Sequence, residues 1–370
     1  MATDPGRIAA GHTAGHRLTL DGITHRFGEF TAVEDVDLDI PGGELVALLG
    51  PSGCGKSTLL RIIAGFVGQS EGRVLFDGEP VDHLAPNRRG AGLVFQNYAL
   101  FPHMSVARNI AYGLEARRTP KHVIAPRVAE MLRLVHMEAF RDRLPRELSG
   151  GQQQRIALAR ALAVDPKILL LDEPFGALDK NLRLDMQIEV KRLQRQYGIT
   201  TILVTHDQEE ALSMADRIAV MNRGRIEQLS PPTEIYDRPQ TLFVNQFVGT
   251  VNLIAGELAD GVLSTVRLGN GAVFCAAPAP HLATGTKVVV SVRPEHLRLH
   301  DAQGDGHWAA RIKVVLPLGP HVMYEAQLHD GTSIRISEPR DAGARLLLPG
   351  DDVFVAPVQA SACRVFASVT

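Results

Sequence analysis

The segment that most constrains this chain is Gly50–Thr58, which reads GPSGCGKST. It follows an apolar run at 45–49 and leads into a helix-like run at 59–64. A glycine-rich loop between a buried strand and a helix can turn several backbone N–H groups toward one anion, and the start of the helix adds positive potential. A ligand-free strand–helix turn is the alternative, but such a turn needs neither the lysine nor the hydroxyl of Lys56 and Ser57. The segment therefore predicts a binding site for a nucleoside triphosphate.

The composition is typical of a globular chain with two domains. Its 370 residues include 39 lysines and arginines against 41 acidic residues, a net charge of −2. This balance predicts no overall electrostatic attraction to nucleic acid or to anionic lipid. The three cysteines, Cys54, Cys275 and Cys363, are too few and too scattered for a disulfide framework or a metal cluster. A reducing, cytosolic compartment is therefore expected.

The sequence contains no apolar run near the roughly 18–20 residues that a membrane-spanning helix needs. Residues 1–17 lack the apolar core of a signal peptide and are expected to form a disordered leader. If the protein works at a membrane, other subunits must hold it there.

Short strands are expected on both sides of Phe27. Residues 18–20 and 32–38 alternate apolar and polar side chains, as half-buried antiparallel strands do. An aromatic ring at this place could stack on an adenine, or it could be an ordinary core residue, and composition alone favours neither. Further along, a strand at 93–95 ends in Gln96, whose amide oxygen could serve a metal or a water, or could simply be polar surface.

The run Leu148–Arg155, LSGGQQQR, predicts a second anion-binding turn at the start of a helix. Two phosphate cradles in one polypeptide indicate that they meet across a subunit interface. The turn by itself could also be only a helix cap.

Two buried strands are expected to end in polar side chains. The run 167–171 leads into Asp172 and Glu173, and the run 201–205 leads into His206. An aspartate at a strand end beside a phosphate loop can orient Mg²⁺ through water, and the neighbouring glutamate could polarise an attacking water. Because ligands bind at the carboxyl edge of open α/β sheets, His206 is expected at the same edge as Glu173.

The residue pattern of the sequence changes near Pro239. After this residue, short strand-like runs separated by glycine and proline predict an all-β domain. Small β-barrels often bind nucleic acid, so the charge matters here. Residues 239–370 contain 10 lysines and arginines against 11 acidic residues, and aromatic residues do not cluster. Nucleic-acid binding is therefore disfavoured.

Taken together, these motifs resemble the ATP-binding cassette of ABC transporters over residues 18 to about 240. The resemblance implies an α/β P-loop fold with an antiparallel β subdomain and a helical subdomain at about 97–160. It places a leader at 1–17, the cassette at 18–238 and a β-rich, OB-like (TOBE) regulatory domain at 239–370. The motifs that carry it are GPSGCGKST at 50–58, Gln96, LSGGQ at 148–152, ILLLDE at 168–173, ALD at 177–179 and His206.

The C-terminal part resembles the regulatory domain of one group of importer ATPases, through SVRPE at 291–295. The segment FVNQFVG at 243–249 and Asn252 look most like polyamine and 2-aminoethylphosphonate importers. This implies uptake of putrescine or spermidine, with 2-aminoethylphosphonate, ferric iron, sulfate or sugar as alternative solutes. A non-transport cassette ATPase acting on DNA or ribosomes is disfavoured, because such proteins usually carry two cassettes or long coiled-coil insertions.

The resemblance also implies roles for individual residues, with ATP and Mg²⁺ as the ligands. Glu173 is expected to act as general base, His206 to contact the γ-phosphate, and Gln96 to sense it. Ser57, Gln96 and Asp172 are expected to serve Mg²⁺. Nucleotide is expected to contact Phe27, where a tyrosine is commoner, and Ser52, Gly53, Cys54, Gly55, Lys56, Ser57 and Thr58 of one subunit, with Ser149, Gly150, Gly151, Gln152 and Asp179 of the other.

The implied partners are a second cassette subunit, two transmembrane permease subunits and an extracytoplasmic solute-binding protein, with no nucleic acid. The implied location is the cytoplasmic face of the inner membrane, as a peripheral subunit.

Overall fold

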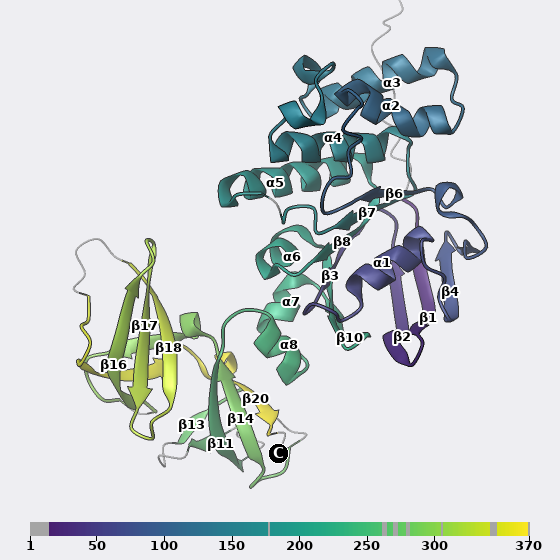
Figure 1. Cartoon of the computed structure of the whole chain (residues 1–370). Coiled ribbons are helices and arrows are strands. Elements are labelled where there is room, and N and C mark those ends of the chain that lie inside the picture. Colours follow the sequence, from purple (N-terminus) through teal and green to yellow (C-terminus); the bar gives the residue numbers. More distant parts are fainter. Residues whose placement is uncertain are drawn as a thin grey trace, which may run out of the picture. The chain divides into compact units, whose positions relative to one another are not determined.

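A computed structural model describes residues 15–176, 178–260, 265–268, 273–278, 282–304, 306–340 and 346–368. Most of the leader expected at 1–17, and Ala177 of the ALD motif, lie outside the described residues. The chain divides into two compact units between Ile235 and Tyr236. Each unit is described by itself below (Figure 1).

A six-stranded sheet forms the centre of the first unit, in the order β10-β9-β3-β8-β7-β6. All neighbours pair in parallel except β10, which pairs antiparallel with β9. Both β3 and β8 are buried along their whole length, as parallel strands covered on both faces are. The bounds are β3 Leu45–Leu49, β6 Ala91–Val94, β7 Ile168–Asp172, β8 Thr200–Thr205, β9 Arg217–Asn222 and β10 Arg225–Ser230.

A second, antiparallel sheet runs in the order β2-β1-β4-β5. Its strands are β1 Leu18–Phe27, β2 Phe30–Ile40, β4 Glu71–Phe76 and β5 Glu79–Pro80. The expected alternation is observed, since the apolar side chains of β1 and β2 join one core cluster with β3 and with helix α1, Lys56–Ala64. The helix that follows the phosphate loop is therefore packed between two sheets.

The helices between β6 and β7 form the helical subdomain, and α5 and α6 connect β7 to β8 and β8 to β9 (Figure 1). In α5, the side chains of Met186, Val190 and Leu193 are buried, while those of Leu182 and Tyr197 are half-buried. The helices are α2 Val106–Ala116, α3 Lys121–Leu134, α4 Gly150–Ala163, α5 Lys180–Tyr197, α6 Gln208–Met214, α7 Pro232–Asp237 and α8 Leu242–Phe247. Among the described residues, no helix is both long and apolar enough to cross a bilayer.

The second unit is built on two five-stranded antiparallel sheets, in the orders β13-β12-β11-β14-β20 and β15-β19-β16-β17-β18. One apolar cluster that includes Trp308 joins them. The expected all-β region is thus observed. Its strands are β11 Asn252–Asp260, β12 Thr265–Leu268, β13 Val273–Cys275, β14 Lys287–Val292, β15 Leu297–His300, β16 Trp308–Pro317, β17 His321–Leu328, β18 Ser333–Pro339, β19 Asp352–Pro357 and β20 Arg364–Ala367.

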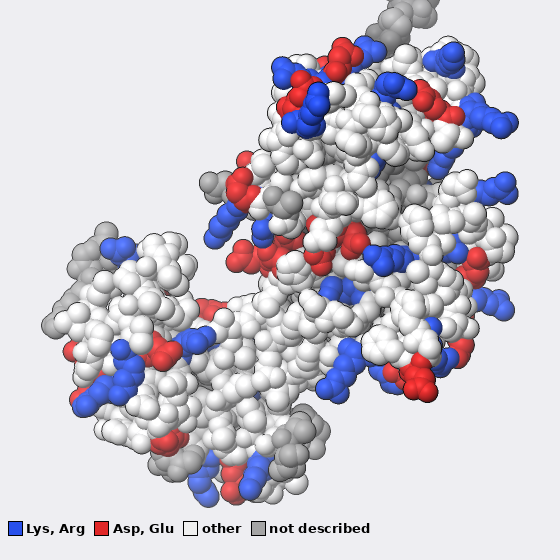
Figure 2. Space-filling view, in the orientation of Figure 1, with Lys and Arg blue, Asp and Glu red and all other residues white. Residues whose placement is uncertain are grey.

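Charged side chains of both signs are interspersed over the face of the first unit in Figure 2, as the near-zero net charge leads one to expect.

Candidate active site

The phosphate loop lies between β3 and α1, in the setting that the sequence predicts. Its conformation requires glycine at two positions, because Gly53 and Gly55 have φ angles of 80° and 107°. At Gly55 a Cβ atom would also lie 2.4 Å from the carbonyl oxygen of Ala32. The loop is therefore held closely against β2, with its curvature set by backbone alone.

Lys56 is buried, with 6% of its surface exposed. Its Nζ donates to the carbonyl oxygens of Gly50, at 2.6 Å, and Pro51, at 3.0 Å. The ammonium group thus lies inside the curve of the loop, at the positive end of α1. Backbone amides, a helix start and a lysine together form a cradle of the kind that triphosphates occupy.

Ser57 and Asp172 bring an alcohol and a carboxylate together from α1 and from the end of β7. Ser57 Oγ lies 3.5 Å from Asp172 Oδ1. Burial, and then the charge of Glu173, raise the pKa of Asp172, while Arg61 and Lys56 only partly counter this effect. Oxygen ligands beside a carboxylate that lacks a full counter-charge are a donor set that fits Mg²⁺.

Two side chains, those of Gln96 and His206, contact the carboxylate of Glu173. Gln96 Nε2 donates to Glu173 Oε2 at 3.0 Å, and His206 Nδ1 lies 3.2 Å from the same oxygen. The three residues follow β6, β7 and β8, which are neighbours in the sheet. Because adjacent parallel strands present their carboxyl ends at one edge, residues that are far apart in the chain meet there, as expected for Glu173 and His206.

The backbone of Glu173 is fixed as firmly as its side chain. Its φ is 46°, an uncommon value for a residue with a side chain, and its N–H donates to the carbonyl oxygen of Val204 at 2.9 Å. The carboxylate itself is oriented by its contacts with Gln96 and His206, and the Glu173 side chain is 23% exposed. The carboxylate is thus both oriented and open to water.

Phe27 lies at the end of β1 and is 53% exposed, so the core alternative is wrong. Its ring packs edge-to-face on His25, with the ring centroids 4.4 Å apart. The free face is available to a planar ligand. Adenine stacking stays a prediction.

The Ser-Gly-Gly turn is a helix cap in this chain. Ser149 caps α4, with its Oγ accepting from Gln152 N at 3.4 Å and its own N–H donating to Gln152 Oε1 at 2.9 Å. Gly151 lies so close to Leu182 that a Cβ would come within 2.8 Å of that side chain. Asp179 likewise caps α5, with its Oδ1 accepting from Leu182 N at 3.0 Å. Phosphate binding stays a prediction for this turn.

The residues that support His206 were not predicted from the sequence. Thr205 Oγ1 donates to Glu210 Oε2 at 2.6 Å, and Arg183 Nη1 donates to Asp207 Oδ2 at 2.9 Å. Asp207 caps α6 as well, so both residues that flank His206 are held in place. The spacing of Asp207 and Glu210 is that of a helix-start motif and could have indicated this support.

The fold and the site together define an ATP-binding cassette. The phosphate loop follows a central strand, and an Asp-Glu pair lies at the end of a nearby strand. A glutamine and a histidine contact that glutamate, and the helical subdomain is separate. The comparisons agree. Residues 33–176 match the family model described as ABC transporter, and residues 290–366 match the TOBE domain.

Relatives similar over most of the chain include proteins named spermidine/putrescine import ATP-binding protein PotA. The one from Rubrobacter xylanophilus is 48% identical over 344 residues, covering 92% of this chain and 91% of the relative. PotA 1 from Pseudomonas aeruginosa is 50% identical over 320 residues, covering 85% and 86%. A solved ATP-binding cassette, described as a dimer in a post-hydrolysis state bound to ADP and Pi, is 34% identical with a TM-score of 0.52, covering 58% of this chain and 98% of its own. The chain belongs to the ABC transporter family, among its ATP-binding proteins with a TOBE domain.

Proposed function

We propose that this chain is the ATP-hydrolysing subunit of a polyamine importer, and that two copies enclose two MgATP molecules at their interface. The observation that carries the hydrolytic part is the cluster of Gln96, Glu173 and His206 beside Ser57 and Asp172. The polyamine part is supported by the names of relatives at about half identity over most of the chain.

In the proposed reaction, the phosphate loop and Lys56 hold the triphosphate. Glu173 accepts the proton of the attacking water, and the contacts with Gln96 and His206 keep its carboxylate in one orientation. Ser57 and Asp172 are the residues that would hold Mg²⁺, which supplies positive charge against the phosphate oxygens. Phe27 offers its exposed face to the adenine.

The second half of each site comes from the partner copy. We propose that Ser149, Gly150, Gly151 and Gln152 contact the γ-phosphate held by the opposite subunit, and that Asp179 acts across the same interface. Nucleotide then binds the closed dimer more tightly than the open one, which is the differential affinity that a switch needs. Moving the equilibrium from 1:99 to 99:1 takes about 5.5 kcal/mol. Cleavage of the γ-phosphate removes the bridge and reopens the dimer.

The same proposal includes two permease subunits and an extracytoplasmic solute-binding protein, with this chain at the cytoplasmic face of the inner membrane.

An uptake assay tests the polyamine assignment. With its membrane partners expressed in cells that lack their own polyamine uptake, the wild type should accumulate labelled putrescine or spermidine, and Glu173→Gln should not. Equal uptake with and without the wild-type chain would refute the polyamine assignment, while labelled 2-aminoethylphosphonate tests the principal alternative solute.

Dimer closure is tested by light scattering on the purified chain. Glu173→Gln should change from monomer to dimer in saturating MgATP, because it holds nucleotide without cleaving it. Lys56→Ala serves as the control that cannot hold nucleotide. A Glu173→Gln variant that binds ATP yet stays monomeric contradicts the shared-site arrangement.

A further inference from the structure

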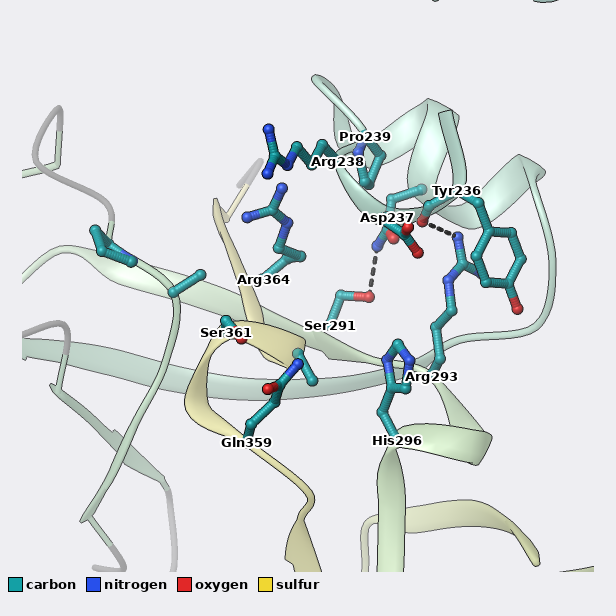
Figure 3. Close-up of a pocket in the computed structure, with 14 residues that line it drawn as sticks. Tyr236, Asp237, Arg238, Pro239, Ser291, Arg293, His296, Gln359, Ser361 and Arg364 are labelled. Carbon is teal, nitrogen blue, oxygen red and sulfur yellow. Dashed lines mark hydrogen bonds between the residues drawn. The ribbon is translucent and has the colours of Figure 1, made fainter. Parts of the chain in front are cut away.

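A cavity of about 670 Å³ lies in the C-terminal unit, and all of its lining residues belong to 236–370 (Figure 3). None of the predicted nucleotide contacts lines it. Its walls come from the start of the unit, from α8, from β14 and β20, and from the short turn before β20. The nucleotide chemistry described above makes no use of this space.

The floor of the cavity is the polar face of a sheet. Ser291 on β14 pairs directly with Arg364 on β20, so both side chains project from the same face. Val290 and Val292, on either side of Ser291, are fully buried in the apolar core on the opposite face. Ser291 is only 2% exposed and accepts a hydrogen bond from Asn245 of α8. Strand pairing, burial and this hydrogen bond therefore fix the position of the residues that form the floor.

One wall is fixed by a buried arginine. Arg293 is 4% exposed and donates to the carbonyl oxygens of Val248, at 2.8 Å, and Tyr236, at 2.7 Å. Its guanidinium lies 3.5 Å from the centre of the Tyr236 ring, a cation–π contact. Tyr236 is thus held from both its backbone and its side chain, and this anchors the segment that carries Arg238 two residues later.

Positive charge gathers at the mouth of the cavity. Figure 3 shows the guanidinium ends of Arg238 and Arg364 beside each other, and burial and the charge of Arg238 lower the pKa of Arg364, with Asp237 acting in the opposite sense. His296 and one acidic residue, Asp237, also line the space, so the arginines outnumber the carboxylate at the mouth. Neighbouring guanidinium groups that repel each other are stabilised by an anion that both can contact, and their fork shape suits carboxylate and phosphate.

We propose that this cavity binds a small organic anion whose carboxylate or phosphate group is held by Arg238 and Arg364. The remainder of the ligand lies over Ser361, Gln359 and His296, which offer hydroxyl, amide and imidazole groups. The site does not depend on the ATPase function.

Calorimetric titration of the full-length chain tests the site, in buffer without nucleotide or Mg²⁺ and at constant ionic strength. Sodium citrate and inorganic phosphate are the two probes, and they distinguish a carboxylate site from a phosphate site. Since phosphate can also enter the phosphate loop, the comparison between variants is decisive. Arg364→Gln should weaken binding of the preferred probe about tenfold or more, because it removes a charge-assisted contact. Arg311→Gln, which removes an exposed arginine on β16, is the matched control and should bind as the wild type does.

Loss of binding in Arg364→Gln with retention in Arg311→Gln supports the site, and Lys56→Ala should keep this binding. Thermal melts without probe establish that Arg364→Gln is folded. Should it fail to fold, Arg238→Gln at the exposed rim replaces it and must show the same loss. Equal affinity in the wild type and the folded variant, or no binding of either probe at about 10 mM (a Kd weaker than the millimolar range), overturns the proposal.

Discussion

Replacement of Glu173 by glutamine separates the chemical role of this residue from its structural role. The substitution keeps the shape of the side chain and leaves the backbone hydrogen bond to Val204, at 2.9 Å, untouched. What changes is one oxygen that faces Gln96 and His206 at the solvent-accessible edge of the sheet. Loss of a partly exposed contact of this kind costs about 1 kcal/mol of folding free energy at most. The variant should therefore fold normally.

The catalytic cost is larger. General-base assistance contributes roughly 10²–10⁴-fold, which is about 2.7–5.5 kcal/mol of activation free energy. We therefore expect Glu173→Gln to lose at least about a hundredfold in kcat while its melting temperature and its affinity for ATP stay near those of the wild type. Glu257→Gln, the same chemical change at an exposed position on β11, should leave turnover unchanged.

Steady-state phosphate release measures kcat, and equilibrium titration with a fluorescent ATP analogue measures affinity. Turnover by Glu173→Gln within a few-fold of the wild type would refute the general-base role. A parallel loss of affinity and turnover would show instead that Glu173 mainly holds the nucleotide.

Three further substitutions test the loop and its surroundings. Lys56→Ala removes the ammonium group that bonds to Gly50 and Pro51, and should raise the Kd for ATP at least about tenfold in equilibrium titration; unchanged affinity contradicts the cradle. Gly55→Ala places a Cβ 2.4 Å from Ala32 O at a φ of 107°. The free energy of unfolding, measured by urea-induced unfolding, should therefore fall by about 2 kcal/mol or more. A change below about 0.5 kcal/mol would be inconsistent with this close packing. Asp172→Asn should raise the melting temperature without nucleotide at pH 7.5, because the pKa of Asp172 is raised by burial and by Glu173, so the wild type loses stability as pH rises through that pKa. The difference should shrink as pH falls below about 4, the ordinary pKa of an aspartate, because Asp172 is then protonated in both the folded and the unfolded state. A variant that melts below the wild type at pH 7.5 contradicts the assigned direction.

Local signals in the sequence determined much of this protein. Glycines at 53 and 55, between a five-residue apolar strand and a helix, specify the phosphate loop because only glycine adopts those φ angles without strain. The change to short alternating strands after Pro239 likewise predicts the all-β unit. Apolar and polar side chains alternate with a period of two residues in a strand, so neighbouring residues alone reveal the pattern. Features of this kind are readable because the residues that cause them are adjacent in the chain.

Other features depended on which strands became neighbours. Phe27 could have been core or surface from composition alone, and only its place at the end of β1 leaves the ring exposed. Gln96 meets Glu173 because β6 and β7 are adjacent in the sheet, although helices α2 to α4 separate them in the chain. Ser291 and Arg364 share a cavity for the same reason, through the pairing of β14 with β20.

The sequence by itself thus determined the elements and the chemical character of the groups at their ends. The sequence also indicated that Glu173 and His206 share one edge of the sheet, since both follow buried strands. Tertiary structure decided which of the other groups face one another, because strand order follows from how the apolar faces pack and not from order along the chain.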